Sequence, residues 1–452
     1  MTSTADPGPE PTRGSQRLEP GPSARQAPGR LVSRVILLAE GLDPLDLVGD
    51  DGFVWRSAAG TLVGTGVAAR VPVGTGPGRI ERAAEAVATI LEAAEVEDDA
   101  SGLGPAAVGA LPFHPANPGA LVVPSLLLRT DPQGRTWAVL TEPGPFDPPP
   151  AADLLARLRA TTRDDVRWPA ARRLDGPRPT GGPGATGLTG LEAWRAAVLA
   201  ALEAIGSGRL DKVVLAREAA VEAAWPFPRV ELLRRLQRRP GGSTFLYASG
   251  GFVGASPELL VLRRGRVATS RPMAGTVPQG DGASDGADGL ARLTGSPKEA
   301  VEHRLVVDAV AEGLAKVADR VQVGRPEVVR LATVAHLATE ITADLTGPLP
   351  TALELAGLLH PTPAVGGSPR DAALAAIAAL EPFDRGCYAG PVGWVDRAGD
   401  GEWAVALRGA TLQGRHARLV AGAGIVPGSD PDAEWAETEH KLRAMLEVLL
   451  TP

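Results

Sequence analysis

The chain has 452 residues, with 46 Lys plus Arg against 53 Asp plus Glu, which gives a net charge of −7. An acidic chain without a basic block is a poor candidate for nucleic-acid binding, while 44 % apolar residues supply ample core. The single cysteine, Cys387, excludes an intrachain disulfide and a cysteine-based metal cluster, which suits the reducing cytoplasm. No apolar run approaches the ~20 residues of a membrane helix, so we expect a cytoplasmic protein with neither a membrane nor a nucleic-acid partner.

Composition divides the chain into segments. Residues 1–30 contain six prolines and almost no large apolar side chains, and we predict a disordered tail there. Residues 31–173 consist of short β-rich runs separated by glycine, with an Ala/Glu-rich helix predicted over 78–94. A Pro/Gly/Thr-rich stretch at 174–190 predicts a linker or long surface loop before residues 191–452.

The last segment mixes helices and strands without a regular βαβ alternation. Helices are predicted at 191–205, 230–238, 297–320 and 430–450, and strands at 212–217, 244–248, 252–255, 390–395, 403–412 and 418–422. A hairpin is predicted over 259–269, and the Gly/Asp-rich residues 280–289 predict a mobile loop. We therefore expect an α+β fold with antiparallel sheets rather than a doubly wound fold.

Two pairs of glutamates have the spacing of neighbours on one helix face. Glu299 and Glu302 lie three residues apart on a predicted helix, and Glu434 and Glu437 repeat this spacing on the last helix. If the two faces met, the carboxylates would form an all-oxygen cage suited to a hard divalent ion.

Each pair also has a purely structural interpretation. Ser296 as N-cap and Glu299 three residues later would form a capping box, although Glu302 lies beyond it. Glu437 and Lys441 are four residues apart, in the orientation that stabilises an exposed helix by a few tenths of a kcal/mol.

Lysine is rare in this chain, so its positions are informative. The four lysines are Lys212, Lys298, Lys316 and Lys441; arginine supplies the remaining positive charge. Lys212 opens an apolar run, where a partly buried lysine with a lowered pKa could act as a base, which arginine cannot. The alternative is a lysine at a strand edge that extends to water.

Glu258 lies between two apolar runs, where burial could hold a carboxylic acid neutral. A glutamate in a turn is the equally plausible alternative. We expect His336 and His360 to be core or cap residues rather than ligands, since no His-x-x-x-His motif occurs.

The stretch Gly422-Ala-Gly-Ile-Val-Pro-Gly428 superficially matches a dinucleotide-binding fingerprint. Pro427 and the late position in the chain do not fit a first βα unit. We interpret the stretch as a turn whose amides, with the N-terminus of the following helix, receive a carboxylate.

Taken together, residues 191–450 resemble the chorismate-utilising enzymes and, within them, the isochorismate synthases. The resemblance rests on ordered motifs: Lys212-Val-Val-Leu-Ala-Arg217, Phe252-Val-Gly-Ala-Ser-Pro-Glu258, Ala274-Gly-Thr276, Lys298-Glu-Ala-Val-Glu-His303, His336-Leu337, Leu359-His-Pro-Thr-Pro-Ala-Val-Gly-Gly367, Arg385-Gly-Cys-Tyr-Ala-Gly-Pro-Val-Gly393, Ala406-Leu-Arg408 and the block from Gly422 to Lys441. It implies large antiparallel sheets packed together and flanked by helices. Residues 31–173 are assigned by position to the variable first part of the same fold.

The resemblance also implies a reaction, in which water adds to C2 of the chorismate ring while the C4 hydroxyl leaves. Lys212 would be the general base that activates the water, and Glu258 the general acid that protonates the departing hydroxyl. The two groups then need environments that shift their pKa values in opposite directions.

The remaining site residues follow by the same resemblance. Mg²⁺ is expected as cofactor, with Glu302 and Glu437 as direct ligands and Glu299 and Glu434 acting through water. The residues expected to bind the substrate are Gly275, Thr276, Tyr388, Arg408, Gly422, Ala423, Gly424 and Lys441. A monomer is expected, because family members are commonly monomers.

Within the family, ammonia-using synthases lack the base lysine, so Lys212 favours water as nucleophile. Aminodeoxychorismate synthases place a lysine where this chain has Ala274. Salicylate synthases share Lys212 and Glu258 and then eliminate pyruvate. They are the main alternative, although Thr362-Pro-Ala-Val-Gly366 matches the isochorismate type. A catalytically inactive chorismate-binding protein would lack the base, the acid or a metal glutamate, and all are present here.

Overall fold

The computed structural model describes residues 30–97, 101–131, 133–161, 166–174, 190–239, 245–278, 293, 295, 297–331 and 334–451. The predicted disordered tail, apart from residue 30, lies outside these residues. The body of the predicted linker at 174–190, the whole loop at 280–289 and Ser296 of the predicted capping box also lie outside them.

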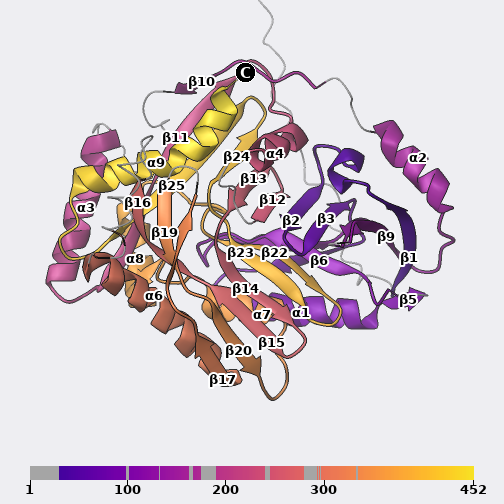
Figure 1. The fold of residues 1–452 in the computed structure, drawn as a ribbon, viewed down its shortest axis with the longest axis horizontal. Coiled ribbons are helices and arrows are strands. Elements are labelled where there is room, and N and C mark those ends of the chain that lie inside the picture. Colours follow the sequence, from indigo (N-terminus) through magenta and orange to yellow (C-terminus); the bar gives the residue numbers. More distant parts are fainter. Residues whose placement is uncertain are drawn as a thin grey trace, which may run out of the picture.

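Two large sheets dominate the described residues (Figure 1). The thirteen-stranded sheet has the order β10 (Ala171–Leu174), β11 (Lys212–Ala223), β25 (His416–Ile425), β24 (Gly409–Gln413), β13 (Phe252–Ser256), β12 (Phe245–Ser249), β2 (Phe53–Ser57), β3 (Gly60–Thr65), β8 (Leu126–Thr130), β9 (Arg135–Pro143), β1 (Leu31–Glu40), β5 (Glu95–Glu97), with β21 (Gly367–Ser368) beside β11. Its neighbouring strands are antiparallel except β1 and β5, which are parallel.

The nine-stranded sheet has the order β17 (Ala318–Val323), β20 (Ile341–Leu345), β15 (Val267–Arg271), β14 (Leu259–Arg264), β23 (Gly401–Val405), β22 (Pro391–Asp396), β6 (Ala106–Ala110), β7 (Gly119–Val123) and β4 (Ala69–Val73). A small third sheet consists of β16 (Met273–Pro278), β19 (Val334–Ala338) and β18 (Glu327–Arg330).

Helices flank the sheets, as Figure 1 shows. They are α1 (Arg79–Ala93), α2 (Ala151–Thr161), α3 (Gly190–Gly206), α4 (Arg229–Gln237), α6 (Pro297–Ala315), α7 (Ala352–Leu359), α8 (Arg370–Leu380) and α9 (Pro431–Leu450), with a 3-10 turn at Pro44–Leu47. The predicted α+β fold with antiparallel sheets is confirmed. The antiparallel pairing of β14 with β15 likewise confirms the predicted hairpin.

Residues before and after the 174–190 stretch build the same sheets. In the thirteen-stranded sheet, β12 pairs with β2, which places Tyr247 opposite Trp55. In the nine-stranded sheet, β22 pairs with β6 and places Gly393 opposite Gly109. Both large sheets therefore contain strands from before residue 174 and strands from after residue 190.

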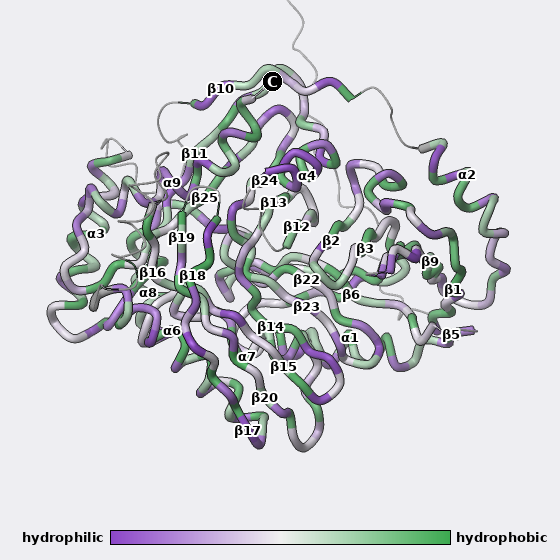
Figure 2. The backbone as a smooth tube through the Cα atoms, viewed as in Figure 1, coloured by the Kyte–Doolittle hydropathy of each residue, from purple (hydrophilic) through white to green (hydrophobic). Residues whose placement is uncertain are grey.

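A core of large apolar side chains joins the two sheets. Trp55 and Tyr247 of the first sheet and Trp394 of the second belong to one cluster of fully buried residues. Figure 2 shows the same distribution, with hydrophobic residues concentrated along the central strands and hydrophilic ones frequent on the outer helices. Burial of each such side chain stabilises the fold by about 1.5–3 kcal/mol, so this core fixes how the sheets face one another.

The helix predicted over 297–320 is too long. Helix α6 ends at Ala315, and the amides of Lys316 and Val317 bond to carbonyls three residues back, which closes the helix with a tight turn. Residues 318–323 then pair with β20 as an edge strand. The helical pattern of the sequence continues past Ala315, but these residues pair with the edge of the nine-stranded sheet instead.

The strand predicted over 403–412 is in fact two strands in different sheets. Strand β23 belongs to the nine-stranded sheet and β24 to the thirteen-stranded one. The residues between them include Arg408, which has a left-handed backbone with φ of 51°. A left-handed non-glycine residue is uncommon and is typical of a functional position.

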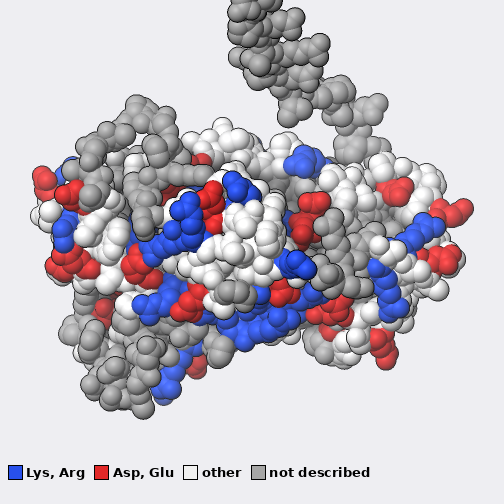
Figure 3. All heavy atoms as spheres, turned by 90° about the horizontal axis from the view of Figure 1, so that it is seen from above, with Lys and Arg blue, Asp and Glu red and all other residues white. Residues whose placement is uncertain are grey.

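Charged groups of both signs lie among uncharged ones on the surface (Figure 3). Figure 3 shows Lys and Arg side chains beside Asp and Glu side chains on one face, with several cationic groups along its middle. Ion pairs such as Arg173–Glu439 and Arg239–Glu447 join segments that are distant in the sequence. Exposed pairs of this kind contribute at most about 1 kcal/mol each, so the fold depends on the core.

Candidate active site

A pocket of about 580 Å³, including the space at its mouth, opens among α6, α9, β25 and the small third sheet. Its walls are Val214, Pro257, Glu258, Met273, Ala274, Gly275, Thr276, Glu302, His336, Ala364, Val365, Tyr388, Leu407, Arg408, Gly422, Gly424, Glu437 and Lys441. Most of the site residues predicted from the sequence are among them. The exceptions are Lys212, Glu299, Ala423 and Glu434.

Lys212 lies behind the pocket wall, bound to a residue that lines it. Its side chain is 1 % exposed, and Nζ lies 2.7 Å from Oε1 of Glu302. The alternative of a lysine that extends from a strand edge to water is therefore wrong. Burial of two charges costs more than a well-packed apolar pair would, so stability alone does not explain a lysine here.

Gly424 leaves room for this buried pair. A Cβ atom at position 424 would lie 2.6 Å from Oε1 of Glu302 and 3.0 Å from Cε of Lys212. Both distances are shorter than ordinary van der Waals contact. The glycine-rich motif thus permits the close approach of α6 and Lys212 to strand β25.

The stretch 422–428 is not a single turn, contrary to the sequence interpretation. Gly422 and Gly424 lie within strand β25, and the turn begins only at Val426, whose carbonyl accepts the amide of Ser429. The first-turn amides of α9 bond to the side chain of Asp430. The helix N-terminus is already capped and is not available for a substrate carboxylate. The side chain of Ala423 lies in the core.

Glu258 is buried in the connection between β13 and β14, with 3 % of its surface exposed. Its amide donates to Oγ of Ser256, and that hydroxyl donates to the carbonyl of Val405, so the turn is rigid. Burial raises the pKa of the Glu258 carboxyl to about 7, against the opposing effects of the Met273 amide and the positive charge of Lys212. The carboxyl is therefore substantially protonated at neutral pH and suited to donate a proton.

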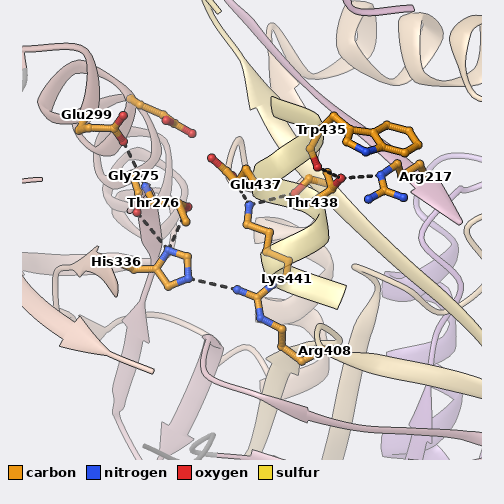
Figure 4. A network of polar contacts seen from close by, with 12 residues as sticks. Arg217, Gly275, Thr276, Glu299, His336, Arg408, Trp435, Glu437, Thr438 and Lys441 are labelled. Carbon is orange, nitrogen blue, oxygen red and sulfur yellow. Dashed lines mark hydrogen bonds and ion pairs between the residues drawn. The ribbon is translucent and has the colours of Figure 1, made fainter. Parts of the chain in front are cut away.

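A chain of hydrogen bonds connects α6 to Arg408 (Figure 4). The amide of Thr276 donates to Glu299, the hydroxyl of Thr276 lies 3.2 Å from Nδ1 of His336, and Nη2 of Arg408 lies 3.2 Å from Nε2 of His336. Gly275 has a φ of 74°, and a Cβ there would lie 2.9 Å from Glu299. These contacts fix the wall that holds Arg408.

Two more groups face the pocket from the other side. Nζ of Lys441 donates to the carbonyl of Gly422 at 2.9 Å and pairs with Glu437. Burial raises the pKa of Tyr388, against the positive charges of Arg385 and Arg408. The Tyr388 hydroxyl thus stays protonated and can donate a hydrogen bond to a ligand oxygen.

Helix α9 is held in place by Arg217 of β11, on the side away from the pocket residues Glu437 and Lys441 (Figure 4). Nε of Arg217 donates to Oγ1 of Thr438 at 2.5 Å, and its guanidinium carbon lies 3.7 Å from the ring centroid of Trp435. A hydrogen bond and a cation–π contact together fix the rotation of the helix.

A buried ion pair that was not predicted from the sequence supports the pocket floor. Arg385 and Glu381 are both almost fully buried; Arg385 also donates to the carbonyls of Val214 and Val365. Glu381 in turn accepts the amide of Ala216. Their spacing of four residues was the available signal, but Arg385 lies beyond the end of α8, and only the fold shows that the pair is interior.

The four glutamates do not form one cluster in the described part of the chain. No group of three His, Cys, Asp or Glu side chains there is close enough to hold a metal ion. Glu302 and Glu437 nevertheless line the same pocket from α6 and α9, and each already contacts an ammonium group. Carboxylate oxygens are the hard ligands that Mg²⁺ prefers, and each of these two carboxylates would exchange its ammonium partner for the ion.

Comparisons with known proteins identify the family of the chain. Residues 46–450 match the family model described as chorismate binding enzyme. The chain is 39 % identical over 320 residues to isochorismate synthase DhbC of Bacillus subtilis, covering 68 % of this chain and 79 % of that protein. It is 36 % identical over 355 residues to isochorismate synthase EntC of Escherichia coli K12, covering 76 % and 81 %.

A solved structure shows the same fold. MenF, the menaquinone-specific isochorismate synthase from Escherichia coli, superposes with a TM-score of 0.73 at 27 % identity, covering 93 % of this chain and 95 % of that one. None of the helices in the described ranges is long and apolar enough to cross a membrane. The family model matches most of the chain, several relatives exceed 30 % identity, and the fold is shared. The chain therefore belongs to the chorismate-binding enzymes.

Proposed function

We propose that this protein is a magnesium-dependent isochorismate synthase, which converts chorismate to isochorismate. The observation that carries the proposal is a buried lysine beside a pocket that also contains a buried glutamic acid with a pKa near 7. The names of the relatives DhbC and EntC support the same activity. The product would serve menaquinone or siderophore synthesis.

In this mechanism Lys212 takes a proton from the attacking water. A lysine acts as a base through its uncharged amine, which an arginine in the same place could not supply. Water then bonds to C2 of the ring, the double bonds shift, and the bond from C4 to its hydroxyl breaks. Glu258 donates its proton to that hydroxyl, which leaves as water, so one water enters and one departs.

Positive groups on the pocket wall bind the two carboxylates of chorismate. Arg408 and Lys441 supply charge, and Tyr388 supplies a neutral hydrogen-bond donor. In a chain with a net charge of −7, this local concentration of cations is what attracts a dianion.

Mg²⁺ is proposed to be held directly by Glu302 and Glu437, and through water by Glu299 and Glu434. When bound, it supplies positive charge that offsets the ring carboxylate of the substrate. Glu302 would then exchange Lys212 for the metal, which would release the Lys212 amine from its ion pair.

Replacement of Glu302 by glutamine is expected to raise the half-saturating Mg²⁺ concentration by about tenfold or more, because a direct ligand loses its charge. Titration calorimetry with Mg²⁺ and the magnesium dependence of turnover measure the effect. Glu312→Gln, an exposed change on the same helix, is the control and should leave both unchanged. An unaltered titration for Glu302→Gln would count against the ligand assignment.

Gly424→Ala is expected to lower kcat by about 100-fold while the fold persists, because the added methyl group displaces Lys212 and Glu302. Steady-state kinetics and circular dichroism measure the two effects. Gly206→Ala is the matched control, since a Cβ there meets no atom within 4 Å. Full activity of Gly424→Ala would show that the placement of this pair does not matter.

Incubation of the purified protein with chorismate and Mg²⁺, followed by chromatographic separation, tests the proposed function. Isochorismate as the accumulating product is the expected result. Salicylate with an equal amount of pyruvate would instead establish a salicylate synthase. Unchanged chorismate, with demonstrated binding, would identify an inactive chorismate-binding protein.

A further inference from the structure

His336 occupies a central place in the pocket wall, although the mechanism above does not use it. It lies in β19 of the small third sheet, opposite Thr276 of β16, and is 7 % exposed. Its Nδ1 atom lies 3.0 Å from the carbonyl oxygen of Gly275, and its Nε2 atom lies 3.2 Å from Nη2 of Arg408.

These contacts determine the tautomer of the ring. A guanidinium group only donates hydrogen bonds, so Nε2 of His336 must accept the bond from Arg408. A carbonyl oxygen only accepts, so Nδ1 carries the hydrogen and donates it to Gly275. Burial lowers the pKa of His336 to about 3, and the charges of Arg408 and Lys441 act in the same direction. The imidazole is therefore neutral.

Arg408 is fixed at both ends. Its backbone is left-handed, the hydroxyl of Tyr247 donates to the preceding carbonyl of Leu407 at 2.7 Å, and the carbonyl of Arg408 accepts the amide of Ala255. At the other end, His336 binds the guanidinium. Among the described side chains, no carboxylate lies within ion-pair distance of that guanidinium, and Glu437 and Glu258 act on its charge only from farther away.

We propose that His336 is a positioning residue, a neutral acceptor that aims the Arg408 guanidinium at a carboxylate of the substrate. A glutamate or aspartate in this place would orient the arginine equally well but would neutralise its charge. A neutral imidazole fixes the direction and leaves the charge for the ligand. This inference rests on the proposed function, in which Arg408 binds a chorismate carboxylate.

The alternative role is that of an ordinary core histidine, and the chain contains a matched example. His360 is also 7 % exposed, burial also lowers its pKa to about 3, and its Nε2 atom bonds to the carbonyl of Phe113. It does not line the pocket. A purely structural effect should therefore be the same at both positions.

Three variants separate these roles by calorimetric measurement of the chorismate dissociation constant. In His336→Asn the amide reaches the carbonyl of Gly275 but is too short to reach Arg408, and the dissociation constant should rise about tenfold or more. In His336→Gln the longer side chain reaches Arg408, and the dissociation constant should return to within about threefold of the wild type. His360→Asn should leave it unchanged, whatever happens to thermal stability.

Equal dissociation constants for the Asn and Gln variants at position 336, whether both normal or both weakened, would overturn the proposal. An equally weakened His360→Asn would also overturn it. In turnover assays the Asn variant should raise KM more than it lowers kcat, because the interaction is made before the chemical step. Wild-type protein that binds chorismate but forms no isochorismate would instead refute the proposed function and leave the binding comparison valid.

Discussion

Replacement of Lys212 by alanine should lower kcat for isochorismate formation by about 10³-fold or more, since the variant has no base to activate water. Chorismate should still bind, because the groups proposed to hold its carboxylates are Arg408, Lys441 and Tyr388, which the substitution leaves in place. Rapid-quench or steady-state kinetics measure turnover, and calorimetry measures binding.

Two further variants make this result specific. Lys212→Arg places a permanently charged group beside Glu302 that cannot act as a base, so its kcat should also fall by about 10³-fold. Lys316→Ala, at an exposed position after α6, should have normal kinetics. Substantial turnover in Lys212→Ala or Lys212→Arg would remove lysine from the base role.

Glu258→Gln should lower kcat by about 10²–10⁴-fold, because an amide cannot protonate the departing hydroxyl. The same substitution should change how the stability of the fold depends on pH. In the wild type, burial raises the pKa of Glu258 from 4.5 to about 7 in the folded state. The stability that the neutral acid contributes is present below about pH 4.5 and is lost as the pH rises through 7.

Glutamine does not ionise and shows no such loss. The variant should therefore gain stability relative to the wild type, by about 3 kcal/mol between pH 4.5 and pH 8. Urea denaturation of both proteins at the two pH values measures this difference. If the two proteins differed in free energy of unfolding by the same amount at both pH values, the Glu258 carboxyl would not be held neutral. The assignment of the general acid would then fail as well.

The sequence predicted those parts of the fold that depend on local pattern. The Ala/Glu-rich helix, the start of the last helix at Asp430 and the apolar strand after Lys212 all carry their own signals of periodicity or capping. The family motifs added the predicted site residues, most of which line one pocket.

The parts that the sequence did not predict depend on tertiary contacts. The strand predicted over 403–412 is broken because its halves pair with different sheets, and no local signal marks Arg408 as left-handed. The lack of a His-x-x-x-His motif favours a core or cap role for His336, and nothing in the sequence indicates its contact with Arg408. The predicted length of α6 is too great for a similar reason, because the residues after the helix pair with β20 in a sheet and the local pattern does not show this pairing.

The central claim is that Lys212 activates a water molecule for attack at C2 while Glu258 protonates the departing C4 hydroxyl. One experiment tests it most directly. The reaction is run in water enriched in oxygen-18, and isochorismate is examined by mass spectrometry together with unreacted chorismate. The account predicts one heavy oxygen in isochorismate, at its C2 hydroxyl, and a mass about two units higher. Isochorismate without the label would mean that the hydroxyl migrates within the substrate, which would contradict the account.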